Sequence, residues 1–204
     1  GRTCVYDPAL AEYVGDALRS GAPATGVRFV LYEVDLTGTP ILAEEIGYAD
    51  LIDEGDASAQ DVALRLVVVA ENVTVLDYAT TLDLTLTQGT LTVEGFLRGE
   101  NGLRLDFDIE AVGTHFLNRS TLDVTFDLDV GARDVGISGS VSGVEEGVEG
   151  EGDVDLTVRH GSHSVRLDVS GGGGLIEGSV FVNNNLFATI AGSSSNPTIL
   201  SATG

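Results

Sequence analysis

Long stretches of this chain alternate strictly between apolar and polar residues. From Leu103 to Glu110 every odd position is apolar and every even position is charged, and from Leu122 to Val130 the even positions are apolar. Successive side chains of a β-strand point to opposite faces, so each of these stretches has one apolar and one acidic face. The alternation predicts a β-meander through residues 80–130.

Shorter alternating or β-branched runs predict further strands on both sides of this meander. We expect them at 26–36, 41–48, within 59–79 with a turn at Glu71-Asn72, at 81–87 and 91–94 with a turn at Gln88-Gly89, at 134–142, at 153–159 and 164–169 across His160–His163, and within 175–190 with a turn at Asn183–Asn185. Short connections of this kind join antiparallel neighbours. The chain is therefore expected to be all-β, a mainly antiparallel meander of about a dozen strands that curls as a half-barrel or barrel or splits into a sandwich.

Residues 8–20 carry a helical pattern. An apolar stripe at i, i+3, i+4, i+7 and i+8 is formed by Leu10, Tyr13, Val14, Ala17 and Leu18. Asp7 is a suitable N-cap, Pro8 suits a first turn, and Gly21 suits the end of a helix. The pattern predicts one short N-terminal amphipathic helix.

The expected organisation is a single β-rich domain over residues 1–204. It comprises an N-terminal segment 1–7, the helix 8–20, the antiparallel sheet 26–191 and a C-terminal tail 192–204. Within the sheet, Gly143–Gly152 is predicted to be a flexible acidic connector and Gly171–Gly174 a spacer.

The net charge of the chain excludes two classes of direct partner. The net charge is −22, and all ten basic residues are arginine. Such a surface repels nucleic acid and anionic lipid headgroups, so neither is expected as a direct partner. No run of apolar residues approaches the roughly 18 of a membrane span. Membrane contact is therefore expected to be indirect or through an attached lipid.

Clustered carboxylates are the best candidates for a metal site. A predicted acidic loop at 50–58 contains Asp50, Asp53, Glu54 and Asp56, and a second cluster contains Glu145, Glu146, Glu149, Glu151 and Asp153. Hard oxygen ligands of this kind suit Ca²⁺, although neither stretch has the spacing of an EF-hand loop. Ca²⁺ is thus a weak candidate at the first cluster, and no other cofactor is expected.

Other groups of residues give little support for a metal site or for nucleophilic catalysis. His160 and His163 have metal-like spacing with His115 as a third candidate, but they flank a predicted hairpin tip, where exposed histidines are ordinary. The sequence has no nucleophile elbow of the G-x-S-x-G type. We therefore expect a protein that is not an enzyme.

Three residues are candidates for covalent modification. Cys4, the only cysteine, is a candidate for lipid attachment, and Asn72 and Asn118 begin glycosylation sequons. The sequence contains no methionine, which suggests a removed signal peptide and an extracytoplasmic location, in the periplasm or at the cell surface.

These observations favour a non-catalytic structural or interaction protein, a subunit of a cell-surface assembly or an accessory subunit of a larger envelope complex. Its partners would be other protein subunits, identical or different, bound through strand edges and through termini such as 1–7 and 193–204. The alternative is a lipoprotein-type carrier with an apolar ligand between sheet and helix. Its two walls would be formed by Leu10, Val14 and Leu18 and by Leu105, Phe107, Val124 and Phe126.

Overall fold

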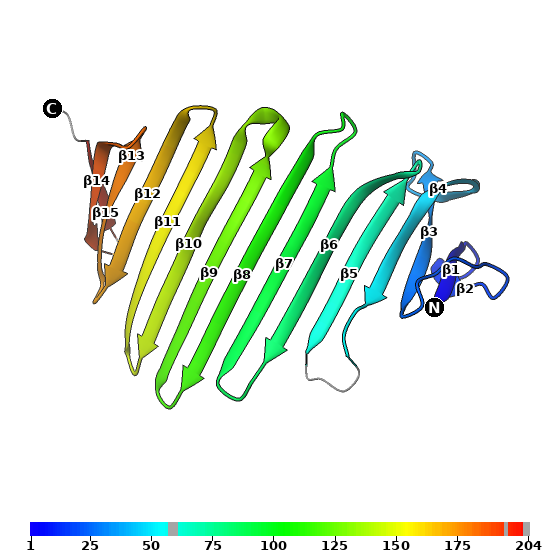
Figure 1. Cartoon of the computed structure of the whole chain (residues 1–204), viewed down its shortest axis with the longest axis horizontal. Helices are drawn as coiled ribbons and strands as arrows, with labels where there is room; N and C mark the ends of the chain where they lie inside the picture. Colours follow the sequence, from blue (N-terminus) through cyan, green and yellow to red (C-terminus); the bar gives the residue numbers. More distant parts are fainter. Residues whose placement is uncertain (57–60, 194–195, 202–204) are drawn as a thin grey trace. The chain divides into compact units, whose positions relative to one another are not determined.

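The computed structural model describes residues 1–56, 61–193 and 196–201. These residues form fifteen strands, β1 to β15, which are hydrogen-bonded in one open sheet (Figure 1). The strands follow one another in chain order except at the start, where β1 lies between β2 and β3. The prediction of an all-β, mainly antiparallel meander is confirmed, with more strands than expected.

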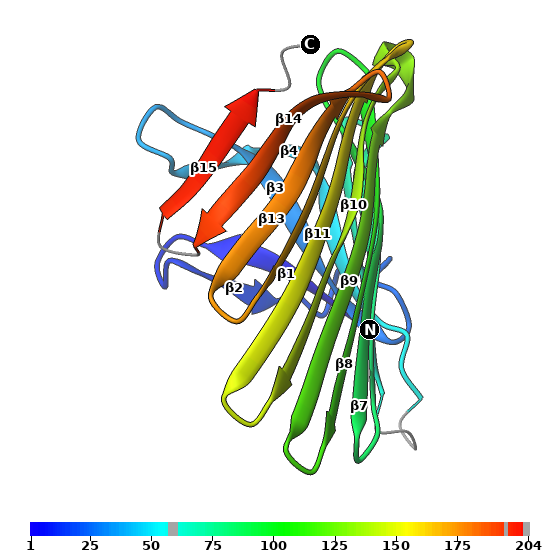
Figure 2. The same cartoon turned by 90° about the vertical axis from the view of Figure 1, so that its left-hand side faces the viewer.

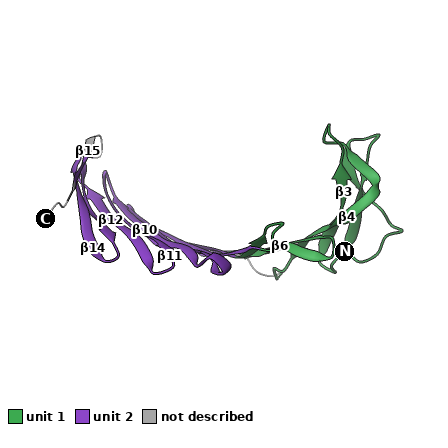
Figure 3. Ribbon diagram, turned by 90° about the horizontal axis from the view of Figure 1, so that it is seen from above, with its two compact units in different colours: residues 1–81, 95–102 green, residues 82–94, 103–204 purple. Residues whose placement is uncertain are grey.

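The chain is divided into two compact units. The first contains residues 1–81 and 95–102, and the second contains residues 82–94 and 103–204 (Figure 3). Two strands, β6 (Val73–Leu84) and β7 (Gln88–Arg98), contribute residues to both units.

The first unit also contains β1 (Arg2–Asp7), β2 (Glu12–Gly15), β3 (Gly26–Val34), β4 (Pro40–Asp53) and β5 (Val62–Ala70). The β1 strand pairs antiparallel with β2 and parallel with β3, so Cys4 lies between Gly15 and Phe29. The turn between β5 and β6 is at Glu71-Asn72, as predicted, and both residues adopt positive φ angles of 50° and 64°.

The small core of this unit lies where β1 and β3 meet. Cys4, Val30 and Tyr32 are 8%, 5% and 9% exposed. Tyr13 from β2 packs edge-on against Phe29, with ring centroids 5.4 Å apart, and its hydroxyl donates a hydrogen bond of 2.9 Å to the carbonyl oxygen of Val30. The segment predicted as helix therefore packs beside the core as a strand, with Tyr13 39% exposed.

The predicted helix over residues 8–20 is wrong. Asp7 accepts a hydrogen bond from the backbone N–H of Ala9 at 2.8 Å, as a cap does, but the chain then turns back into β2, with Ala11 at a φ of 54°. Leu10 and Leu18, two members of the predicted stripe, are 60% and 97% exposed. A helix of about a dozen residues is marginal by itself in water, whereas a strand beside β1 gains backbone partners and packs Tyr13 against Phe29.

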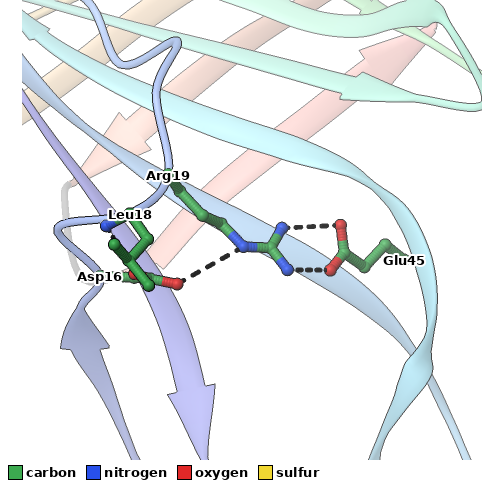
Figure 4. A network of polar contacts seen from close by, with 4 residues as sticks. All are labelled: Asp16, Leu18, Arg19 and Glu45. Carbon is green, nitrogen blue, oxygen red and sulfur yellow. Dashed lines mark hydrogen bonds and ion pairs between the residues drawn. The ribbon is translucent and has the colours of Figure 1, made fainter.

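The segment that follows β2 is held by an arginine rather than by helical hydrogen bonds. Arg19 forms a two-bond contact with Glu45 of β4, with a distance of 2.8 Å from Nη1 to Oε2, and its Nε lies 3.7 Å from Asp16 (Figure 4). Asp16 also accepts a hydrogen bond from the backbone N–H of Leu18 at 2.9 Å. Loop side chains thus replace the predicted last helical turns.

The second unit consists of long strands joined by tight turns (Figure 2). Its full strands are β8 (Arg104–Phe116), β9 (Arg119–Val130), β10 (Val135–Glu146), β11 (Glu149–His160), β12 (His163–Gly172), β13 (Leu175–Val182), β14 (Asn185–Ser193) and β15 (Asn196–Ser201). A short 3-10 helix, η1 (Gly131–Arg133), joins β9 to β10. Two predicted hairpins are confirmed: β11 and β12 turn at Gly161-Ser162, and β13 and β14 turn at Asn183-Asn184, both of which have positive φ.

Several boundaries differ from the predictions. The expected flexible connector 143–152 is a hairpin of β10 and β11 in which Glu146 lies opposite Glu149. The turn expected at Gln88-Gly89 lies at residues 85–87, where the hydroxyl of Thr85 accepts a hydrogen bond from the backbone N–H of Gln88 at 3.0 Å. Much of the tail expected at 192–204 is β15, which pairs with β14, while residues 194–195 and 202–204 lie outside the described residues.

Candidate functional site

The registers of the second unit align the apolar residues of neighbouring strands. In an antiparallel pair, directly opposite residues share a face of the sheet. Ile109 lies opposite Phe126, and Leu156 lies opposite Leu167, so these large side chains belong to one row that crosses the strands. Gly139 completes the row between Phe126 and Leu156. We call this the bulky row.

Similar rows lie on both sides of the bulky row and form what we call the apolar face. Its members are Phe107, Ile109 and Ala111 of β8; Leu122, Val124, Phe126 and Leu128 of β9; Ile137 and Val141 of β10; Val154, Leu156 and Val158 of β11; Val165, Leu167 and Val169 of β12; and Ile176, Val180 and Val182 of β13. Every residue of this set is half-buried or exposed. Leu122 is 51% exposed and Val165 is 46% exposed. The apolar face is thus much more exposed than the interior of a folded domain.

A row of glycines crosses the apolar face four residues away from the bulky row. Gly143, Gly152 and Gly171 are consecutive cross-strand partners in β10, β11 and β12. We call these three residues the glycine row. A groove of about 430 Å³ lies beside it and is lined by Val141, Val154, Val169 and Ile176 among others. Side chains therefore project far from the sheet along most of the bulky row and hardly at all along the glycine row.

The opposite face of the same strands is acidic. Asp108 lies directly opposite Asp127, and Asp155 lies directly opposite Asp168. Arg166 bonds to the second pair, with Nε 2.8 Å from Asp155 and Nη2 3.2 Å from Asp168. Carboxylates of this kind keep a face hydrated, so the two faces of the unit suit water and an apolar partner respectively.

The acidic face also contains a hollow of about 510 Å³. Glu151, Asp153 and Glu177 are among its lining residues. Two of them, Glu151 and Asp153, belong to the second predicted acidic cluster; of its other three members, Glu146 and Glu149 face each other at the hairpin end and Glu145 lies opposite Gly150. Among the described residues, no group of three or more His, Cys, Asp or Glu side chains is arranged to hold a metal ion.

The four weak calcium candidates are not gathered around one point. Asp50 lies inside β4 and is 7% exposed, and both of its oxygens accept hydrogen bonds from Arg28, at 2.7 Å from Nε and 2.6 Å from Nη2. These bonds raise the pKa of the Arg28 guanidinium, which also lies 3.6 Å from the ring centre of Tyr48. The Asp50 carboxylate is therefore already neutralised by an arginine.

The remaining acids of that cluster have other contacts. Asp53 accepts a hydrogen bond from the backbone N–H of Gly55 at 3.0 Å, and Glu54 lies 3.7 Å from Arg65. Asp56 ends the described part of this stretch, and residues 57–60, including Ser58 of the predicted acidic loop, lie outside it. The first part of the predicted loop, from Asp50 to Asp53, is the end of β4.

The three histidines do not converge. His160 and His163 are cross-strand partners at one end of β11 and β12, and both are exposed. His115 lies at the far end of β8, where its Nδ1 is 2.8 Å from the hydroxyl of Ser120. Val135 of β10 pairs with His160, and Glu145 of β10 pairs with Ser120, which is also the cross-strand partner of His115. Val135 and Glu145 are ten positions apart on one strand, so the two ends of the sheet are separated by about 34 Å.

The candidate modification sites lie in contrasting environments. Asn72 and Asn118 are both exposed at hairpin turns, where a glycan would have room. Cys4 is buried in the core of the first unit, so its thiol is covered in the folded chain. Attachment of lipid at Cys4 stays a prediction.

Across the described ranges, no helix combines the length and apolarity needed to cross a membrane. Comparisons of the chain with protein-family models, curated proteins and solved structures found no match.

Proposed function

We propose that this chain is a non-catalytic structural or interaction protein outside the cytoplasm, a subunit of a cell-surface assembly or an accessory subunit of an envelope complex. The observation that supports the proposal is the apolar face of β8–β13, a continuous sheet surface of large apolar side chains that its own unit leaves half-buried or exposed. Exposed apolar patches of this size mark sites of association.

The arrangement favours association through the face in addition to the strand edges expected from the sequence. Of the two terminal segments, 1–7 contains β1, which pairs with β3 through Arg2–Cys4 and with β2 through Cys4–Asp7. The described part of the C-terminal segment forms β15, and β15 and β2 are the two terminal strands of the sheet. Edge pairing is therefore open at these short strands, whereas burial of apolar area is available across six strands.

Covalent footprinting of side chains in material isolated from the source tests this proposal. Hydroxyl radicals modify exposed phenylalanine rings, and reactivity in the urea-unfolded chain gives the reference for each ring. Because Phe126 is half-buried in the chain alone, the reactivity of the dilute, isolated chain is the second reference. We expect Phe126 of the apolar face to be protected severalfold more in the source material than in the isolated chain, while Phe116, which is 66% exposed on the other face of β8, keeps its reactivity. An unchanged reactivity of Phe126 would show that nothing covers the apolar face. Fractionation of the source cells tests the location, and we expect the chain in an envelope or extracellular fraction.

A carrier of an apolar ligand is the second candidate, supported by the groove beside the glycine row. Its volume of about 430 Å³ is within the range of small-molecule sites, and its lining includes the aliphatic side chains of Val141, Val154, Val169, Leu175 and Ile176. The wall expected from a helix at residues 8–20 does not form, so such a ligand would lie on the sheet alone. Native mass spectrometry of the chain from its source tests this, and a bound lipid-sized mass is the expected result for a carrier.

A further inference from the structure

We infer that the partner that covers the apolar face is a second copy of this chain, bound face to face as a two-sheet sandwich. This inference rests on the proposed function, because it identifies the occupant of the same surface. Three observations support it: the area of the face, its relief and the separation of charge between the two faces.

The area matches what a stable dimer needs. Strands lie about 4.8 Å apart and rise about 3.4 Å per residue, so six strands that overlap from the bulky row to the glycine row, about six residues each, present a patch of about 29 Å by 20 Å, or about 600 Å². Specific, stable protein interfaces begin at about 1,200 Å² of total buried area, or about 600 Å² per partner. Beta-sheets that pack through apolar faces in this way form sandwiches with the faces about 10 Å apart.

The shape of the apolar face in one copy complements the shape of the same face in a second copy. A two-fold axis that runs across the strands reverses the direction along them, so one end of each strand in one copy meets the other end in its partner. When the bulky row of one copy lies over the glycine row of the other, Leu156 of β11 approaches the partner's Gly152 and Leu167 of β12 approaches the partner's Gly171, and the reverse contacts repeat by symmetry. Gly152 and Gly171 leave the space that these two leucines occupy, while Phe126 of β9 packs against the partner's Leu122. Such an isologous contact closes after two copies and uses both apolar faces.

The charges favour this arrangement over a stack of copies. Each chain has a net charge of −22, and in a face-to-face dimer the acidic faces of β8–β13 point outward into water. Repulsion between the two copies is then long-range and is screened by salt, with a Debye length of about 8 Å at 0.15 M and about 3 Å at 1 M. Burial of apolar area is not weakened by sodium chloride, so association is expected to tighten as salt is raised.

Sedimentation equilibrium of the full chain, in 0.15 M and 1 M sodium chloride, tests the inference. We expect a species of twice 21.2 kDa whose dissociation constant falls at the higher salt concentration. Leu156→Asp places a charge in the centre of the interface and is expected to weaken the dimer at least about 100-fold. The matched control is Thr157→Asp, which adds the same charge on the acidic face of the same strand and leaves the dimer formed.

A second measurement keeps the test decisive if Leu156→Asp does not fold. Footprinting of Phe126 in the wild-type chain as a function of concentration is expected to show protection with the same midpoint as the increase in mass. A dimer in which Phe126 stays reactive, or which both variants weaken equally, would place the interface elsewhere and overturn the inference.

Other outcomes separate this inference from the proposed function. A monomer at all concentrations and salts, with Phe126 protected in material from the source, would overturn the second copy and leave a different protein as the partner. A monomer that takes up a lipid on this face would favour the carrier instead. A monomer with Phe126 reactive in both preparations would overturn the inference and the proposed function together.

Discussion

Neutralising Asp50 should destabilise the first unit by a measurable and local amount. Asp50→Asn keeps the size of the side chain and removes its charge. Both oxygens of Asp50 accept hydrogen bonds from Arg28, and the two side chains are 10% and 21% exposed, so the guanidinium loses its counter-charge in a place with limited access to water.

The magnitude follows from this geometry. Removing one partner of a fully buried ion pair costs about 3–5 kcal/mol. Arg28 is partly exposed, its guanidinium keeps the ring of Tyr48 at 3.6 Å, and the asparagine oxygen can still accept one hydrogen bond. We therefore expect a loss of about 2–3 kcal/mol, below the fully buried value. For a chain of this length, that corresponds to a fall in Tm of about 4–12 °C.

Differential scanning calorimetry measures the fall, and hydrogen exchange locates it. We expect faster exchange of the amides of β3 and β4, while those of β9–β11 keep their rates. Asp53→Asn is the control: the same change three residues further along β4, at a carboxylate bonded to the N–H of Gly55, should alter Tm by less than about 2 °C.

A double-mutant cycle with Arg28→Met completes the test, and we expect Asp50 and Arg28 to be coupled by about 1–2 kcal/mol. The reasoning is refuted if Asp50→Asn changes Tm no more than Asp53→Asn does, or if the coupling is zero. Calcium addition provides a further check on the acidic cluster, because a site that uses Asp50 would stabilise the wild-type chain and not this variant.

Three further predictions concern single groups. Tyr13→Phe removes the hydrogen bond to the carbonyl of Val30 and should lower the free energy of unfolding, measured by urea titration, by about 1 kcal/mol. Because burial raises the pKa of Tyr13, its contribution to stability is complete below a pH of about 10 and is lost as the pH rises through the higher pKa of the folded state. Absorbance at 295 nm as a function of pH follows this ionisation. The Cys4 thiol, buried in the folded chain, should react with iodoacetamide far more slowly than in urea, and equal rates would contradict the fold of β1. Asp127→Asn relieves the repulsion from Asp108 directly opposite and should raise stability by about 0.2–1 kcal/mol at low salt, with the gain shrinking in 1 M sodium chloride.

Local pattern was sufficient to predict much of the sheet. The alternation from Leu122 to Val130 predicted both the strand and its two faces, and the register of β9 confirms that its apolar members share a row with those of β8 and β10. The turns at Glu71-Asn72 and Asn183-Asn184 were predictable because asparagine tolerates the positive φ that a tight turn requires.

The helix and the acidic cluster needed information that local pattern does not contain. The apolar spacing of residues 10–18 fits a helix, yet Tyr13 finds its partners in Phe29 and Val30, which are more than a dozen residues away. Asp50 resembled a metal ligand because Arg28, 22 residues earlier, becomes its neighbour only through the pairing of β3 with β4. Long-range pairing decided both cases.

The sequence predicted only part of the apolar face of β8–β13. Each two-faced strand was evident from its own residues, but the alignment of six apolar faces depends on registers between strands. The glycine row was missed because Gly143–Gly152 was interpreted as a flexible connector. The sequence did contain a signal for this row, because Gly139, Val141 and Gly143 occupy every second position of the strand, in the same two-residue period as its apolar residues.

From β8 to β15, strands that are consecutive in the chain pair with each other. A sheet with this pairing can gain or lose one hairpin without altering the partners of the remaining strands, since parity and strand direction both repeat after two strands. Duplication of a hairpin by unequal recombination would widen the apolar face by about 10 Å and leave its neighbours in register. The length of such a chain can therefore change in evolution by whole hairpins, with the area of the apolar face growing or shrinking in proportion.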